Sequence, residues 1–193
     1  TFAAPTVSAS SDAGFYIRFN GGVVNAQCFQ STNTIGACNT GSVNAYTWYH
    51  VAYVRSGSTF TIYLNGTSAA TASSSAAVNY DAGWNLNIGS AYTNVYHYNG
   101  YLSNVRIVNG TALYTSNFTV PTRQLEVTPE TVLLCCHSSQ DPTQEATGKT
   151  LTSIRTDSSS GPLLSSFIPD VGKDYARYGT VLEGNVEFPS LNY

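Results

Sequence analysis

The sequence contains no methionine, few charged residues and no long apolar run. Only 10% of its 193 residues are charged, against about 25% in typical soluble domains. The eight lysines and arginines form no cluster, so the electrostatic footprint of a nucleic-acid-binding protein is missing. No apolar run approaches the ~20 residues of a membrane-spanning helix, and no signal peptide is visible. We therefore expect no nucleic-acid partner and no membrane insertion.

Acidic residues are nearly absent from the first two thirds of the chain. Up to Leu125 the only acids are Asp12 and Asp81, and all five glutamates follow that point. From Ser138 onward Asp, Glu, Ser, Thr, Pro and Gly dominate. We predict a folded domain over residues 1–137, and an acidic linker and C-terminal arm over 138–193 that docks on the domain or on a neighbour. Because the chain starts at Thr1 and lacks methionine, we expect a processed product or a piece of a longer polypeptide.

The strongest local signal is the stretch from Trp48 to Thr67. Two runs with period-two alternation flank a Ser-Gly-Ser turn, which predicts a β-hairpin. β-Branched and aromatic residues dominate both runs, as a half-buried pleated surface requires. Asn65-Gly66 closes the second run, and both residues tolerate the positive φ of a tight primed turn. His50 shares a face with Trp48, which favours a hydrogen-bonded core histidine.

Turn signals elsewhere recur every ~8–12 residues, the spacing of an all-β sandwich. Further strands are predicted at 14–19, 23–29, 84–88, 101–108 and 132–136, with an edge strand and loop over 67–79. We interpret 30–45 as loop and 112–116 as one helical turn. No window carries a helical period of useful length. The sequence therefore predicts an antiparallel, all-β jelly-roll sandwich with an irregular C-terminal extension.

The four cysteines leave their redox state open. Cys28 and Cys38 bracket a turn-rich stretch, so they could face each other on neighbouring strands and form a disulfide. Two buried thiols are an equally weighted alternative. Cys135 and Cys136 follow a strand-like run, in which neighbouring side chains point to opposite faces. A zinc site is disfavoured, because no C-x-x-C pair accompanies His137.

Two blocks of this sequence resemble a known family. Trp48-x-His-Val-Ala-x-Val-Arg-x-Gly57, followed by Tyr63-x-Asn-Gly66, is similar to the central hairpin of concanavalin A-like jelly rolls of the laminin-G and pentraxin branch. Gly100 to Val108 resembles the next strand of those domains. The continuation to Pro121 is most similar to the version in structural proteins of tailed phages, especially marine ones. The resemblance covers Gly14 to Cys136.

The resemblance implies a viral structural protein at the virion surface, outside the cell, such as a fibre, tail or capsid-decoration component. Its expected partners are other virion proteins, further copies of itself in a homo-oligomer, and a host-surface glycan. A structural assembly subunit without a sugar ligand is the alternative. The related glucanases imply a third reading, a glycoside hydrolase, which we disfavour.

Nothing in the sequence matches a catalytic constellation. Glycoside hydrolysis requires two carboxyl groups flanking the scissile bond. Glu183 and Glu187 could share a strand face, but they lie in the acidic tail and are better explained as solvated. No Gly-x-Ser-x-Gly occurs. We therefore expect a non-enzymatic protein.

The best binding candidate is a tyrosine-rich stretch between residues 79 and 98. Aromatic faces stack on the C–H surfaces of sugars, and amide or carboxylate groups bond their hydroxyls. This stretch offers both kinds of group. We predict that the ligand-binding residues are Asn79, Asp81, Trp84, Tyr92, Tyr96, His97 and Tyr98.

No cofactor is expected, with calcium as the one alternative. Laminin-G and pentraxin domains often bind calcium through loop oxygens, which Asp81 and Asn79 would imitate. Contacts between subunits are the other explanation for the tyrosines, because tyrosine is enriched at interfaces.

Overall fold

The computed structural model describes residues 4–5, 13–30, 33–78, 86–89, 98, 101–138, 144–154, 180–181 and 185–188. These residues form β-strands, turns and irregular segments, and no helix occurs among them. Every pairing between the strands is antiparallel. The predicted all-β antiparallel fold is thereby confirmed.

The first sheet has the order β2-β3-β4. Its strands are β2 (Ala13–Asn20), β3 (Val23–Gln30) and β4 (Asn33–Ser42). The loop predicted over 30–45 is therefore wrong. β4 alternates buried and exposed positions like a half-buried strand. Its Thr, Asn and Gly residues obscure that alternation in the sequence, because they are weak strand formers except for Thr.

The predicted hairpin is confirmed and extends by a third strand. β5 (Val51–Ser56), β6 (Thr59–Leu64) and β7 (Thr67–Ser73) form the second sheet, in that order. Leu64 pairs with Thr67 across the two-residue turn Asn65-Gly66, where both φ angles are positive. These are the angles that a type I′ turn requires.

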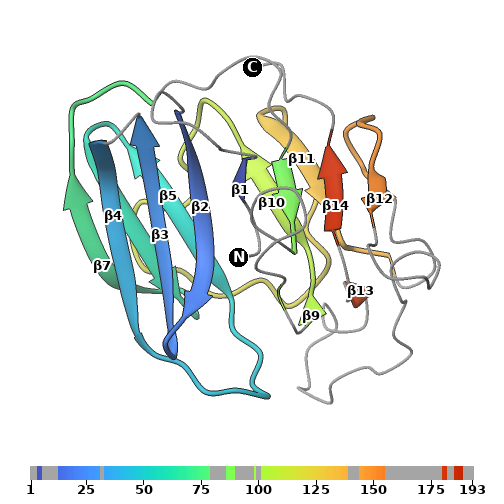
Figure 1. Ribbon diagram of the computed structural model, residues 1–193, viewed down its shortest axis with the longest axis horizontal. Helices are drawn as coiled ribbons and strands as arrows, with labels where there is room; N and C mark the ends of the chain where they lie inside the picture. The colour runs from blue at the N-terminus through green and yellow to red at the C-terminus, as the bar shows by residue number, and fades with distance from the viewer. Residues whose placement is uncertain are drawn as a thin grey trace.

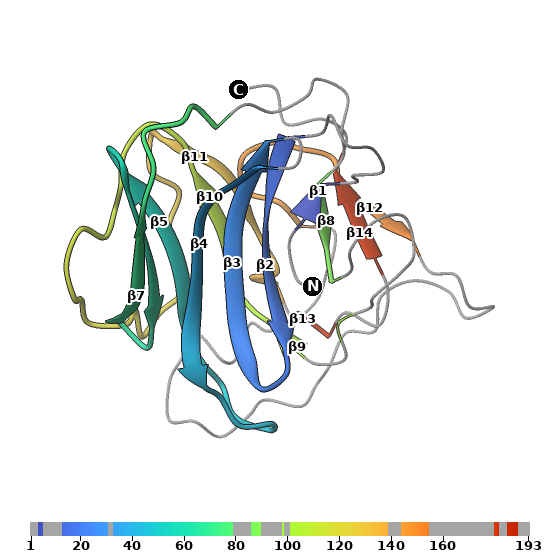
Figure 2. The same cartoon turned by 60° about the vertical axis from the view of Figure 1, so that its left-hand side comes forward.

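These two sheets enclose one core, which we call the hairpin core. It combines side chains of β3, β4 and β6, so the sheets pack face to face. Figures 1 and 2 show β7, β5 and the β2-β3-β4 sheet together at one end of the molecule. The buried members are Val24, Ala26, Cys28, Ile35, Cys38, Val43, Phe60 and Ile62.

The remaining strands come from distant parts of the sequence. One sheet has the order β1-β8-β14-β12, formed by β1 (Ala4–Pro5), β8 (Leu86–Ile88), β14 (Asn185–Phe188) and β12 (Thr152–Ile154). Two further pairs join β9 (Tyr101–Leu102) to β13 (Thr180–Val181), and β10 (Val105–Val108) to β11 (Thr131–Cys135). In both views β2 is the strand of its sheet that lies toward β14, and Figure 2 shows β8 on the same side (Figures 1 and 2).

A second core, the long-range core, lies among these strands. Its buried members are Leu86, Ile88, Leu133, Cys135, Cys136 and Leu151. Phe15 of β2 packs against both this cluster and the hairpin core. One half-buried aromatic side chain therefore links the two cores.

Strands from the C-terminal part of the chain belong to this second region. β12 and β14 pair with each other, and β14 also pairs with β8. These strands extend the sheet beside β8, where an unpaired edge would invite other chains. The domain boundary at residue 137 stays a prediction.

Two local predictions fail between residues 101 and 116. The strand predicted over 101–108 is interrupted after Leu102, because Asn104 adopts a positive φ of 53°. Asparagine tolerates this left-handed conformation better than most residues. The helical turn predicted at 112–116 is absent, and the segment is a series of bends.

The vicinal cysteines also differ from expectation. β11 ends at Cys135, and Cys136 adopts a positive φ of 56°. This change of direction places both side chains in the long-range core, with their sulfur atoms 3.7 Å apart. The expectation of opposite faces is therefore wrong at this strand end.

Cys28 and Cys38 are free thiols in the structure, and both are buried in the hairpin core. Cys28 pairs with Ile35, whereas Cys38 pairs with Ala26, so the two are offset along the ladder. Burial raises the pKa of the Cys28 thiol to about 11. A neutral, buried thiol is chemically inert.

Candidate functional site

The predicted ligand-binding stretch falls largely outside the described residues. Of its members only Tyr98 is described: it is half-buried, and its backbone N–H donates to the Gly89 carbonyl at 2.7 Å. Burial raises the pKa of the Tyr98 phenol. The residues outside the described ranges are Asn79, Asp81, Trp84, Tyr92, Tyr96 and His97.

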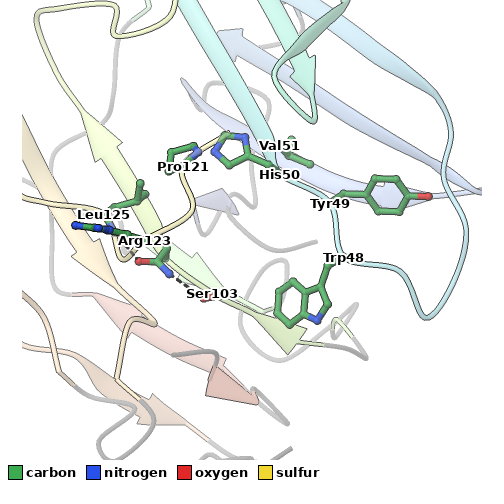
Figure 3. Close-up of a pocket in the computed structure, with 9 residues that line it drawn as sticks. Trp48, Tyr49, His50, Val51, Ser103, Pro121, Arg123 and Leu125 are labelled. Carbon is green, nitrogen blue, oxygen red and sulfur yellow. Dashed lines mark hydrogen bonds between the residues drawn. The ribbon is translucent and has the colours of Figure 1, made fainter. Parts of the chain in front are cut away.

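The described residues contain a hollow that was not predicted, which we call the Trp48 hollow. Its volume is about 90 Å³, well below the roughly 300–1,000 Å³ of a ligand-enclosing pocket. Three segments line it: the entry to β5, the β9–β10 link and the segment before β11 (Figure 3). The lining residues are Trp48, Tyr49, His50, Val51, Ser103, Asn104, Pro121, Arg123 and Leu125.

The first wall is the segment that enters β5, and the Asn65-Gly66 turn fixes it. The His50 N–H donates to Asn65 Oδ1 at 2.9 Å, and the Asn65 N–H donates to the His50 carbonyl at 2.8 Å. In Figure 3 the Trp48 ring projects toward Ser103, whereas the Tyr49 ring points away from the hollow. Trp48 and His50 are half-buried, so His50 lies at a rim rather than deep in a core.

The second wall is the β9–β10 link, and Asn104 organises it. Its backbone N–H donates to the Cys136 carbonyl at 2.9 Å. Its side-chain Nδ2 donates to Ser103 Oγ at 2.9 Å, and its Oδ1 accepts the Leu125 N–H at 3.0 Å. One asparagine in a left-handed conformation therefore ties this wall to the third.

The third wall belongs to the long connection between β10 and β11, which aromatic stacking holds against the hairpin. Tyr114 and Phe118 stack with ring centroids 3.6 Å apart, and the His50 ring meets Phe118 edge-on at 5.4 Å. The Phe118 N–H donates to the Gly66 carbonyl at 2.9 Å. A Cβ atom at Gly66 would overlap the Phe118 carbonyl oxygen. Glycine is therefore required for this approach as well as for the turn.

The hollow combines an aromatic ring, a hydroxyl and a cation, and no carboxylate lines it. Arg123 is exposed at the side opposite Trp48 (Figure 3). Without a carboxylate pair among the described lining residues, the hollow lacks the acid and nucleophile of glycoside hydrolysis. Aromatic faces and hydrogen-bonding groups instead suit a sugar contact.

A half-buried polar cluster around Glu145 connects β11 to the residues that follow Glu145. The Glu145 carboxylate accepts N–H groups from Leu134, Thr147 and Lys149 at 2.7 to 2.9 Å, and the Thr147 hydroxyl at 2.7 Å. Burial alone would raise the pKa of Glu145, but these hydrogen bonds outweigh it and lower the pKa. The pKa of buried His137 is lowered, because desolvation exceeds the attraction of Glu145.

Within the described part of the chain, no group of three or more His, Cys, Asp or Glu side chains is arranged to hold a metal ion. No helix of those same ranges has the length and apolarity to span a bilayer. The calcium ligands predicted at Asn79 and Asp81 lie outside these ranges.

Sequence reasoning missed the hollow because its walls lie far apart in the chain. Trp48 and His50 were assigned to a strand face, yet β5 begins only at Val51. Arg123 carried one usable signal, since it is an isolated cation in a segment poor in charge. Nothing local indicates that Arg123 and Trp48 share a surface.

One family model matches this chain, and its match fits the observed architecture. The model describes the concanavalin A-like lectin/glucanases superfamily, of the laminin-G type, and covers residues 2–115. That range is more than half of the chain and includes β1 to β10. Neither a curated protein nor a solved structure matches the chain. The chain therefore belongs to the concanavalin A-like lectin/glucanase superfamily.

Proposed function

We propose that the chain is a non-enzymatic surface module that binds glycans through the Trp48 hollow. The observation that carries the proposal is the pairing of the Trp48 ring with Ser103 and Arg123, across a hollow without a carboxylate. Such a hollow accepts one edge of a sugar ring, which stacks on the indole while its substituents meet polar groups. Membership of the superfamily is compatible with carbohydrate binding.

The wider setting of this proposal comes from the resemblance to phage structural proteins. We place the module on the surface of a virion, as a homo-oligomer that also contacts other virion proteins. Its ligand there is a host-surface glycan. Tyr46 supports an outward-facing site, because it is fully exposed and lies two residues before Trp48. Its positive φ of 59° is unusual for a bulky residue. Strained residues of this kind cluster at functional sites.

The second candidate function is a purely structural assembly subunit. Three apolar side chains outside the hollow favour it, since Phe19, Leu113 and Val127 are each exposed by more than a third of their surface. Exposed apolar surface marks interaction sites between proteins only when it is contiguous, so this function requires the three side chains to lie on one patch. In this reading calcium and glycans play no part.

A glycan array, followed by titration calorimetry on the best ligand, separates the two functions. Trp48→Ala is expected to weaken glycan binding about tenfold or more, since tenfold corresponds to about 1.4 kcal/mol of lost contact. Trp84→Ala is the matched control, because the chain has two tryptophans and Trp84 belongs to the originally predicted site. Each variant must keep the unfolding midpoint of the parent.

The outcomes point in different directions. Loss of binding only in Trp48→Ala supports the hollow, whereas loss only in Trp84→Ala moves the site to residues 79–98. A flat array, together with self-association of the parent chain in solution, favours the structural function. Hydrolysis of any β-glucan by the parent protein would overturn the non-enzymatic proposal.

A further inference from the structure

We propose that Cys135 and Cys136 are a redox site, which a small-molecule disulfide converts reversibly into a disulfide between the two neighbouring residues. Neither cysteine lines the Trp48 hollow, and the inference does not depend on the proposed glycan binding. It is carried by the contact between the two sulfur atoms, by the backbone conformation that produces this contact, and by the position of the pair at the end of a strand.

The two thiols contact each other inside the long-range core. Their sulfur atoms are 3.7 Å apart, and both residues are almost fully buried, at 0% exposure for Cys135 and 2% for Cys136. The remaining buried members of this core are leucine and isoleucine side chains, which cannot react with a thiol. Each cysteine therefore has the other as its reaction partner in this core.

The backbone of Cys136 brings the sulfur atoms together. Neighbouring side chains of a regular strand point to opposite faces, but Cys136 has a positive φ of 56°. Such an angle is uncommon for a residue other than glycine, and it costs free energy. The Asn104 N–H donates to the Cys136 carbonyl at 2.9 Å and so helps to hold this conformation. Strained residues of this kind cluster at functional sites, and here the strain creates a dithiol.

The position of the pair distinguishes it from the other two thiols. Cys28 and Cys38 lie inside β3 and β4, offset along the ladder, whereas β11 ends at Cys135. The contact with Cys136 and burial raise the pKa of the Cys135 thiol, which keeps the closed site unreactive. Strand ends open locally at a lower free-energy cost than global unfolding. Local opening should therefore expose this pair while the interior thiols stay protected.

The reaction consists of two thiol–disulfide exchanges in the opened site. One cysteine loses its proton to water, and its thiolate attacks a sulfur of the reagent disulfide and expels one reagent thiolate. The second cysteine, likewise deprotonated, attacks the protein-bound sulfur of this mixed disulfide and expels the other reagent thiolate. One S–S bond forms in the protein and one breaks in the reagent. The two cysteines together lose two electrons, and the reagent is reduced to two thiols, which take up the two protons.

The product is expected to be a labile disulfide. Neighbouring Cα atoms are about 3.8 Å apart across a trans peptide, whereas bridged cysteines usually have Cα atoms separated by about 4.4 Å or more. Strained disulfides are reduced more readily than structural ones, so the pair should exchange between its two states in ordinary glutathione buffers. Thiols stay reduced in the cytosol and disulfides persist outside the cell. The pair would thus be reduced during assembly and oxidised at a virion surface, a consequence that alone rests on the proposed location.

The test equilibrates the full chain with mixtures of reduced and oxidised glutathione. After an acid quench, the protein is unfolded and its free thiols are alkylated and counted by mass spectrometry. We expect the parent to lose two thiols together over a limited range of ratios, without a glutathione adduct, and to recover both in excess reduced glutathione. Peptide mapping should place the loss of two hydrogen atoms in the peptide that contains Cys135 and Cys136.

Two kinds of variant assign the reaction to residues. The double variant Cys28→Ala/Cys38→Ala is the control, and it should lose two thiols over the same range of ratios as the parent. Cys135→Ala and Cys136→Ala, made separately, should form no internal disulfide and should carry at most one glutathione adduct. If either of these two variants fails to fold, peptide mapping of the parent decides alone, because it requires no substitution.

Any of three results would overturn the inference. They are four free thiols at every ratio, a pair of thiols lost at Cys28 and Cys38 instead, and a bond between Cys135 and Cys136 that reduced glutathione never opens. A glutathione adduct as the stable product would equally exclude a disulfide between the neighbours. Because no glycan takes part, none of these results bears on the proposed function.

Discussion

The two cores of this protein form from different kinds of sequence. The hairpin core is enclosed by β2 to β7, which follow one another along the chain and are joined by short turns except between β4 and β5. The long-range core brings β8 together with β10 and β11, and the neighbouring sheet reaches to residue 188. Forming contacts between distant segments costs more loop-closure entropy. The hairpin core is therefore specified mainly by contacts between neighbouring strands, whereas the long-range core depends on contacts between distant segments of the chain.

The largest expected effect on stability comes from the close approach of Gly36 to the Phe60 ring in the hairpin core. Gly36 of β4 has a positive φ of 66°, and a Cβ atom there would overlap the Phe60 ring. Gly36→Ala combines overpacking with backbone strain. We expect it to lower the free energy of unfolding by about 3–5 kcal/mol, measured by urea denaturation.

Gly41→Ala on the same strand is the matched control. A Cβ atom at Gly41 meets open space, and its φ is not positive. We expect a change within about 0.5 kcal/mol, as for most surface substitutions. Equal losses in both variants would contradict the packing of Phe60 on Gly36.

Acidification should lower the stability of the long-range core, because Glu145 becomes protonated. Its pKa is lowered in the folded state, so its contribution is present above the unfolded pKa and is lost as the pH falls through the folded pKa. Glu145→Gln should cost about 1–3 kcal/mol at pH 7 because it removes charged hydrogen bonds. Urea denaturation between pH 7 and pH 3 should then show a flatter pH dependence than the parent.

His137 adds a separate window at higher pH. Because burial lowers its pKa, the neutral ring is favoured in the fold. Stability is therefore lost as the pH falls from the unfolded histidine pKa, ~6.5, through the lower folded value. His137→Gln should remove the pH dependence of stability in this range and leave the pH dependence that Glu145 causes. A parent whose stability is constant from pH 7 to pH 3 would contradict both assignments.

The smallest effect is kinetic and compares the two cores directly. Ile62 of the hairpin core and Ile88 of the long-range core are both fully buried. Replacing either by valine should cost about 0.5–1.5 kcal/mol. If the hairpin half forms first, Ile62→Val slows folding and Ile88→Val mainly speeds unfolding. Stopped-flow chevron plots measure both rates. Slower folding in Ile88→Val, with mainly faster unfolding in Ile62→Val, would contradict this order of formation.

Sequence patterns predicted the elements of the hairpin half closely. Alternation and turn chemistry located β2, β3 and the β5–β6 hairpin, because side-chain direction and turn φ angles are local properties. They failed at β4, where Thr, Asn and Gly carry alternating burial without a matching apolar pattern. They also failed at Asn104, whose conformation depends on its bonds to Leu125 and Cys136.

The candidate site was harder to predict from the sequence than the fold was. Six of the seven predicted ligand residues lie outside the described ranges, so they stay predictions. Asn65 was assigned to a turn, yet its side chain also fixes His50. Trp48 and Arg123 line the same hollow, although they are 75 positions apart in the sequence. No local window contains that relationship.

The sequence by itself determined the class of this protein: an all-β, weakly charged domain whose hairpin motif marks its superfamily. These properties follow from side-chain alternation, turn residues and composition, which act within a few positions. Only the tertiary structure decided that Trp48, Asn104 and Arg123 line one hollow, and which glycines lie against aromatic rings or carbonyl groups. Such proximities arise from sheet packing and from hydrogen bonds between distant segments, and neighbouring residues do not encode them.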